Sequence, residues 1–354
     1  MSIFDSGNYA YVATRVKAKR SFLYKKETYE RLLLMGIPEI SRFLGETQYK
    51  NEINELGLKY SGIGLIEQAL NSKFTNVSRE IYGYCKGDLK KMMAAYLQRY
   101  DVWNIKTILR GFSGNANKNE ILKTLLPAGG YSLKFWTDII NSSTNVEDSL
   151  DALKKTEYRE AIMNLEWKKD SLRDVIHNLE DELDKKYYEN MLQSIPISSR
   201  ANRIFINFIR KEIDLLNIKT MFKAKYQNVE PEHIKGKIIE SGAMHRRTIN
   251  ALVNTDGFKE FVSELTSVPG YEALKEPIER MTQDNTGISE IIRMLEKDFM
   301  KTAESFAGKY PISIIPVLDF ILRKKIEMDN IRIITRGKQS GLENERIREM
   351  IILR

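Results

Sequence analysis

The sequence has few cysteines, histidines and prolines, and these shortages exclude several classes of protein. Its 354 residues include one cysteine, Cys85, three histidines and 8 prolines. A single thiol cannot form an intramolecular disulfide, and no Cys/His set is available for a structural zinc ion. We therefore expect a protein of a reducing, cytoplasmic setting that holds no metal.

The sequence also lacks a long apolar run and a phosphate-binding loop. No window approaches 18 uninterrupted apolar residues, and residues 1–11 contain no charged segment followed by an apolar one. The GxxxxGK[ST] pattern is missing, and the glycine run at residues 62–67 has Glu67 where a dinucleotide fingerprint needs glycine. We expect no membrane-spanning helix, no bound nucleotide and no cofactor.

The residues that are abundant favour helices and a real core. Hydrophobic residues make up 42% of the chain, and Leu, Ile, Glu, Lys and Arg fill long stretches between the breakers. The net charge of +8 suits a nucleic acid, an anionic membrane surface or an acidic protein. Acidic residues interrupt the basic ones along most predicted helices, which disfavours a nucleic-acid partner.

A box of ten residues occurs three times, with asparagines 113 residues apart. Each box has an acidic residue three places before its asparagine and basic residues two and six places after it. The acids are Asp101, Asp214 and Glu327; the asparagines are Asn104, Asn217 and Asn330; the bases are Lys106, Arg110, Lys219, Lys223, Arg332 and Arg336. This recurrence indicates a chain built from three similar units.

The same register continues outside the box. Gly129 and Gly242 keep it, and Ile66-Glu67 is repeated as Leu179-Glu180 and, with a slip of three residues, as Leu295-Glu296. The apolar spacing is helical, and no sustained alternation with a period of two is present. We predict an all-α fold of three similar domains in a pseudo-threefold funnel. The units are expected at residues 61–169, 170–282 and 283–354, with N-terminal helices at 1–60 completing the third.

Two bases four residues apart on one helix face repel each other, so each box is expected to meet an acidic group. The box acids of neighbouring helices and the surface of a partner are both candidates. Each asparagine, in the middle of a helix, is expected to bond to a neighbouring backbone or an adjoining unit. A structural role is favoured over a partner contact, because a site needed once would not have to recur.

The remaining polar and sulfur-containing residues favour structural interpretations. Glu180, Asp181, Glu182 and Asp184 are interpreted as Glu/Lys pairs on a solvated helix face. Cys85 is expected to be buried or half-buried, His177 to lie at the surface or at the edge of the core, and the methionines to fill the core. These methionines are Met92, Met93, Met163 and Met191. No set of residues meets the geometric requirements of a catalytic site, so the chain is not expected to be an enzyme.

Three features of the sequence resemble a known family. The stretch NYAYVATRVKA at residues 8–18, the box at residues 101–111 and the threefold recurrence resemble the C subunit of the archaeal A-type ATP synthase, which is similar to the d subunit of the V-type ATPase. One departure is Ala13, where the family pattern is expected to have asparagine. The resemblance implies a helical funnel that caps the membrane proteolipid (c/K) ring and holds the central-stalk subunits D and F.

The resemblance also implies a mechanical function. Such a protein is a non-catalytic rotor socket, one copy per complex, that passes torque between ring and stalk at the cytoplasmic face of the cell membrane. It contacts the membrane surface through the complex and binds neither nucleotide nor nucleic acid. The alternative is an all-helical repeat scaffold or adaptor of another complex, which the number of copies per assembly would distinguish.

Overall fold

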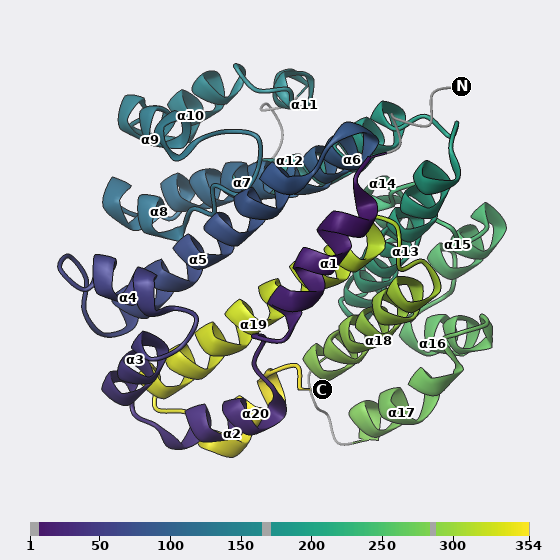
Figure 1. Ribbon diagram of the computed structural model, residues 1–354. Coiled ribbons are helices and arrows are strands. Elements are labelled where there is room, and N and C mark those ends of the chain that lie inside the picture. The colour runs from purple at the N-terminus through teal and green to yellow at the C-terminus, as the bar shows by residue number, and fades with distance from the viewer. Residues whose placement is uncertain (1–6, 165–170, 284–287, 354) are drawn as a thin grey trace. The chain divides into compact units, whose positions relative to one another are not determined.

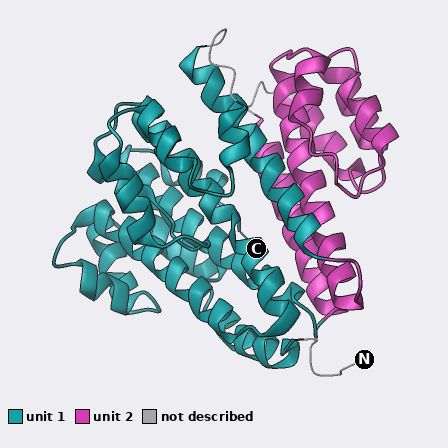
Figure 2. Cartoon of the chain, turned by 90° about the horizontal axis from the view of Figure 1, so that it is seen from above, with its two compact units in different colours: residues 1–195, 311–354 teal, residues 196–310 magenta. Residues whose placement is uncertain are grey.

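The computed structural model describes residues 7–164, 171–283 and 288–353, and it is helical with no strand in these ranges (Figure 1). The prediction of an all-α fold is therefore confirmed. The chain forms two compact units, residues 1–195 with 311–354 (unit 1) and residues 196–310 (unit 2) (Figure 2). The threefold funnel and the boundaries of the sequence repeats stay predictions.

Unit 1 joins the two ends of the sequence. Its terminal helices are α1 (Tyr9–Arg20), α2 (Lys26–Leu34), α3 (Ile37–Gly45), α4 (Lys50–Leu56), α19 (Ile315–Gln339) and α20 (Asn344–Met350). Helices α1, α2 and α3 each pack on α19, and Figure 1 shows α1 lying along it. Val12 and Val16, four residues apart on α1, are buried in this packing. The N-terminal helices and α19 thus form one body.

The rest of unit 1 consists of α5 (Gly62–Tyr84), α6 (Gly87–Leu97), α7 (Arg99–Ser113), α8 (Lys118–Thr124), α9 (Leu133–Ser142), α10 (Val146–Leu153), α11 (Arg159–Met163) and α12 (Leu172–Ser194). Helix α5 packs on α4 and α19, and α7 packs on α10 and α12. The face of α7 with Ile105, Ile108 and Leu109 is fully buried. Apolar positions spaced by three and four residues explain why this segment is a packed helix.

Unit 2 consists of α13 (Arg200–Tyr226), α14 (Pro231–Lys237), α15 (Arg246–Val253), α16 (Phe258–Ser267), the short 3-10 helix η1 (Glu272–Leu274), α17 (Lys275–Gln283) and α18 (Ser289–Lys309). The two long helices α13 and α18 pack together, and α16 packs on α13. Phe222 and Phe261 lie in the core between α13 and α16. Proline at the first position of α14 fits a helix start, because its missing N–H is not needed there.

The 113-residue register is visible in the helices that follow the boxes. Helices α8, α14 and α20 each contain seven residues, and each begins 113 residues after the last. Gly111 and Gly337 occupy the same register before α8 and α20. A Cβ atom added there would lie 2.5 Å from Cγ1 of Ile121 and 2.7 Å from Cγ1 of Ile347. Glycine at these positions therefore lets the following helix pack closely.

The sequence predicted the burial of five sulfur-containing residues, and this prediction is correct for four of them. Cys85, Met92, Met93 and Met191 are buried. Met163 was wrongly placed in the core, since 58% of its surface is exposed at the end of the five-residue helix α11. So short a helix buries only one face, which here is occupied by Ile162.

Candidate functional site: the repeated polar box

The three boxes lie in the long helices α7, α13 and α19, each followed by a short helix. Their asparagines all make the same contact. The Asn104 amide donates to the Leu126 carbonyl (3.1 Å) and accepts from the Leu126 amide (2.8 Å). Asn217 bonds in this way to Ile239, and Asn330 to Ile352, always 22 residues further along.

These paired hydrogen bonds connect each box helix to the segment after the short helix. Asn104 is fully buried, and Asn217 and Asn330 are 2% exposed. A backbone N–H and C=O buried without partners would be costly, and one amide side chain satisfies both. The asparagine therefore fixes where the chain turns back against the box helix.

The first two box acids bind backbone amides in the turn that comes about 30 residues later, after the short helix. Asp101 accepts hydrogen bonds from the amides of Gly130 (2.6 Å) and Tyr131 (3.3 Å). Asp214 accepts one from the Met244 amide (3.0 Å) at the equivalent place in unit 2. A Cβ atom on Gly129 would lie 2.3 Å from Oδ1 of Asp101, which explains why glycine precedes this turn. A Cβ atom on Gly242 would lie 2.2 Å from Oδ1 of Asp214.

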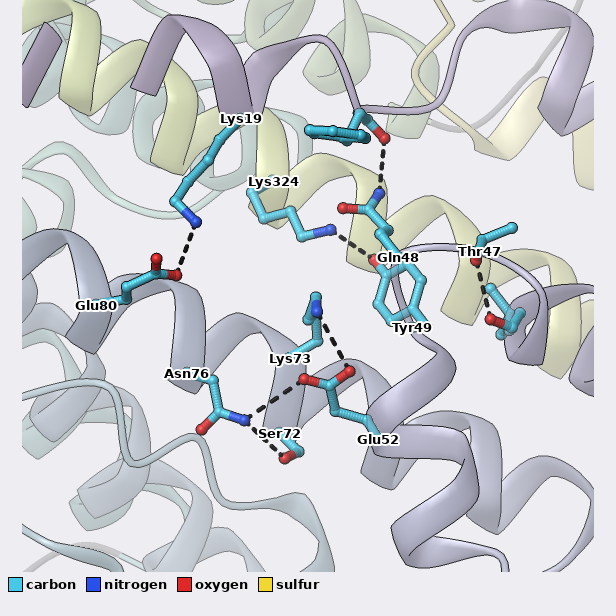
Figure 3. A network of polar contacts seen from close by, with 12 residues as sticks. Lys19, Thr47, Gln48, Tyr49, Glu52, Ser72, Lys73, Asn76, Glu80 and Lys324 are labelled. Carbon is cyan, nitrogen blue, oxygen red and sulfur yellow. Dashed lines mark hydrogen bonds and ion pairs between the residues drawn. The ribbon is translucent and has the colours of Figure 1, made fainter. Parts of the chain in front are cut away.

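The third box acid, Glu327, binds the N-terminal segment instead. Its carboxylate accepts from the Tyr24 amide (2.7 Å) and the Tyr49 hydroxyl (2.7 Å), and it pairs with Lys324 (2.6 Å). Gln48 also donates to it at 3.0 Å. Glu327 and Lys324 are each less than 3% exposed. Figure 3 shows Lys324 directed at Tyr49, close to the Glu52–Lys73 pair between α4 and α5.

Burial lowers the pKa of Lys324, and the neighbouring Glu327 carboxylate opposes that shift. A charged lysine in this position depends on the carboxylate, because water is excluded from both groups. Lys324, Glu327 and Tyr49 therefore form one buried polar cluster that holds the segment around Tyr24 and Tyr49 to α19.

The basic residues of each box reach the first long helix of another repeat. Arg110 makes two hydrogen bonds to Glu180 on α12, at 2.5 and 2.6 Å, and Lys106 pairs with Asp184 at 2.6 Å. In unit 2, Lys219 pairs with Glu296 on α18. Arg336 on α19 pairs with Glu67 on α5 at 2.5 Å. Glu67, Glu180 and Glu296 are the glutamates of the repeated Ile/Leu-Glu pairs.

Two further box bases complete this pattern. Arg332 donates to the Asn71 side chain on α5 (2.7 Å) and pairs with Asp329 (3.3 Å). Lys223 has a lowered pKa because it is partly buried and lies near Lys219, while Glu296 acts in the opposite direction. The repulsion within each basic pair is therefore balanced by a carboxylate or an amide oxygen from a facing helix.

These contacts correct two sequence interpretations. The acids that face the box bases are not the box acids, because Asp101, Asp214 and Glu327 point to backbone amides and the N-terminal segment. Glu182 pairs with Lys185 on a solvated face, as expected. Glu180 is buried against Arg110, so a solvated-face role was wrong for it. Only the shared Ile/Leu-Glu spacing signalled this role in the sequence.

Among the described helices, none is both long enough and apolar enough to cross a membrane. Within the same ranges, no three His, Cys, Asp or Glu side chains are grouped so that they could hold a metal ion. The described box residues bind backbone amides and carbonyls of later turns, the N-terminal segment, and side chains of the facing helices.

The pH dependence of stability should report on Asp101. Burial raises its pKa to about 7, and the amide hydrogen bonds from Gly130 and Tyr131 offset part of that rise. Between about pH 4 and pH 7 the folded state then binds more protons than the unfolded state, so stability falls as pH rises. We expect Asp101→Asn to remove about 1–3 kcal/mol of this loss.

Urea unfolding at pH 5 and pH 8 measures the effect. Asp138→Asn, at an exposed position of α9, is the matched control and should leave the difference between the two pH values as it is in the parent. An equal difference in the parent and in Asp101→Asn would contradict the assignment.

The glycine before the turn gives a second prediction. Gly129→Ala places a methyl group against the Asp101 carboxylate and should lower the free energy of unfolding by about 1–3 kcal/mol. Gly83→Ala, on α5 with open space around its Cα, should instead raise it by about 0.5–1 kcal/mol. Thermal unfolding of both variants checks this, and equal effects would rule out the proposed close contact.

Comparison with known proteins finds relatives of a single family along nearly the whole chain. A family model described as ATP synthase (C/AC39) subunit matches residues 12–350. The C subunit of the A-type ATP synthase of Methanococcoides burtonii is 36% identical over 351 residues, which cover 99% of this chain and 95% of that protein. Its counterpart in Methanosarcina acetivorans is 35% identical, covering 98% and 94%. The one in Haloferax volcanii is 29% identical over the full length of both chains.

Proposed function

Because the chain belongs to the ATP synthase (C/AC39) subunit family, we propose that it is a non-catalytic rotor subunit of an A-type ATP synthase. In this role it is a socket that connects the central stalk to the proteolipid ring in the membrane. Its partners are the stalk subunits D and F and the ring, with one copy of the chain per complex. It lies at the cytoplasmic face of the membrane as a peripheral protein.

The repeated ion pairs are the structural observation that carries this proposal. A socket that passes torque has to resist shear between its helices. Arg110–Glu180, Lys219–Glu296 and Arg336–Glu67 tie each box helix to a facing long helix. The asparagine bonds tie the same helices to the chain 22 residues further along. The box helices are thus held on two sides by polar contacts of defined geometry.

In this role the chain needs neither a nucleotide site nor an ion site of its own. The chain transmits rotation while other subunits bind nucleotide and carry the coupling ion, so the socket itself needs no cofactor. Its net charge of +8 suits a position beside an anionic membrane surface, where a basic residue contributes about 1 kcal/mol.

Selective removal of this chain tests the proposal. Membranes from cells depleted of it should still hydrolyse ATP in the catalytic head, but hydrolysis should no longer drive ion uptake into vesicles. Restoring the chain should restore uptake. Ion uptake that persists at the parental rate without the chain would contradict a role as the link between stalk and ring.

A further inference from the structure

One side of α5 forms the floor of an open groove within unit 1. The groove encloses about 580 Å³. Its floor residues are Gln68, Asn71, Ser72, Thr75, Asn76 and Arg79, which form a single stripe along the helix. The first and the last of these are eleven positions apart, which corresponds to roughly 16 Å of helix, or three turns. A floor of this length fits a partner helix.

The walls of the groove are largely apolar. Its apolar lining includes Leu56 at the end of α4, Tyr60 just after that helix, Leu122 of α8 and Leu133 of α9. Leu133 is 50% exposed at the rim. A helix with apolar side chains towards these walls would remove them from water, as in other complexes in which an amphipathic helix fills a groove.

The charges in the groove are of one sign. Arg79 and Lys123 line it, whereas none of its lining residues is acidic. Both are exposed, and the Lys123 ammonium lies over the ring of Tyr60, another lining residue, 5.8 Å from the ring centre. The Lys123 carbonyl accepts hydrogen bonds from Gln68 and Asn71, which places Lys123 eight to eleven residues of α5 before Arg79. The Lys123 backbone therefore lies roughly 12–16 Å before Arg79, measured along the axis of α5.

A buried hydroxyl on the floor also lacks a partner. Thr75 is 6% exposed, lines the groove, and has no hydrogen-bond partner for its Oγ1 atom among the described residues. Buried polar atoms are rarely left in this state in a finished assembly. Less than 1 Å² of this oxygen atom is exposed, so an occupant of the groove would bond it only after the side chains of the floor had moved.

The groove residues are specific to the first repeat. One repeat later, the positions of Gln68, Asn71, Thr75 and Arg79 are occupied by Asp181, Asp184, Tyr188 and Leu192. Two acids replace amides there, a buried tyrosine replaces the threonine, and the cation is lost. A structural feature of the repeat would recur, whereas this combination occurs once, as expected of a site for one partner.

We propose that this groove receives an acidic amphipathic helix from another protein of the complex. One carboxylate lies near Lys123 and a second, eight to eleven residues away on the same face, lies near Arg79. Apolar residues between them contact Leu122 and Leu133. The proposal rests on the proposed function only for the source of the helix.

Site-specific cross-linking in the purified native complex tests this. A photo-activatable residue at Leu133 in a tagged chain should give one adduct, and mass spectrometry should map it to a helical segment with two carboxylates in that spacing. The same residue at Leu34, which is 79% exposed outside the groove, should not label that segment. No adduct, or an adduct with lipid, with this chain itself or with a segment lacking those acids, would overturn the proposal.

Reversing the two groove charges is the second part of the cross-linking experiment. Arg79→Glu with Lys123→Glu should lower the Leu133 adduct at least tenfold, while the control Lys134→Glu with Lys155→Glu, at exposed positions that do not line the groove, should leave it within twofold. An adduct insensitive to the first pair would overturn the acidic character of the helix. If the tag recovers no ATP synthase subunits, the proposed function fails and the assigned source of the helix fails with it. An intact complex without the adduct overturns the groove alone.

Discussion

Replacing Glu327 with alanine is expected to lower the free energy of unfolding by about 3–5 kcal/mol. The carboxylate is 2% exposed and binds Lys324, Tyr49 and the Tyr24 amide. Its removal leaves the Lys324 ammonium buried beside the Tyr49 hydroxyl, 3.1 Å away, without the carboxylate that balances its charge. An uncompensated buried charge costs more than the pair contributes when intact. Urea unfolding followed by circular dichroism measures the change.

Two further measurements separate the charge from the packing. Glu327→Leu combined with Lys324→Met removes both charges and should recover most of the loss seen in Glu327→Ala. Hydrogen exchange at the Tyr24 amide should become at least tenfold faster in Glu327→Ala, because that amide loses its acceptor. Unfolding free energies equal to the parent, with Tyr24 still protected, would contradict the assignment of Glu327 as the anchor of the N-terminal segment.

Replacing Asn217 with leucine is expected to destabilise unit 2 by about 3–5 kcal/mol. Leucine has a similar shape but cannot bond the Ile239 amide and carbonyl, which the Asn217 side chain holds at 2.9 and 2.8 Å. Both groups would stay buried without partners, and each contributes about 1–3 kcal/mol of the loss. The melting transition of unit 2 should move to lower temperature.

Asn250→Leu is the matched control for this prediction, since Asn250 lies on α15 of the same unit and is exposed. It should change the melting temperature by less than about 2 °C. If Asn217→Leu melts like the parent and only assembly with partner proteins is lost, Asn217 belongs to an interface and its structural role is wrong.

The repeat made part of this architecture predictable. A residue type that recurs at a fixed spacing in three places has to satisfy the same local geometry three times. Asn104, Asn217 and Asn330 indeed make the same backbone contact. The recurrence of Gly129 and Gly242 likewise follows from a carboxylate that leaves no room for a Cβ atom. The all-helical class followed from the spacing of apolar residues.

The contact partners were not predictable, because they depend on which helices face each other. Many acidic residues of the sequence could have paired with Arg110. Glu180 is its partner because α7 packs on α12. Glu327 follows the box pattern yet binds Tyr24, about 300 residues away. The groove beside α5 was missed for a related reason. Its residues come from four short stretches, and none of these carries a motif of its own.

As the proposed socket, this chain connects stalk and ring in a single copy per complex. The most direct test is to purify a tagged copy from detergent-solubilised native membranes and count the copies of each protein recovered with it. We predict one copy of this chain together with subunits D and F and the proteolipid ring. Recovery of a monomer without ring or stalk proteins, or of several copies per ring, would contradict the claim.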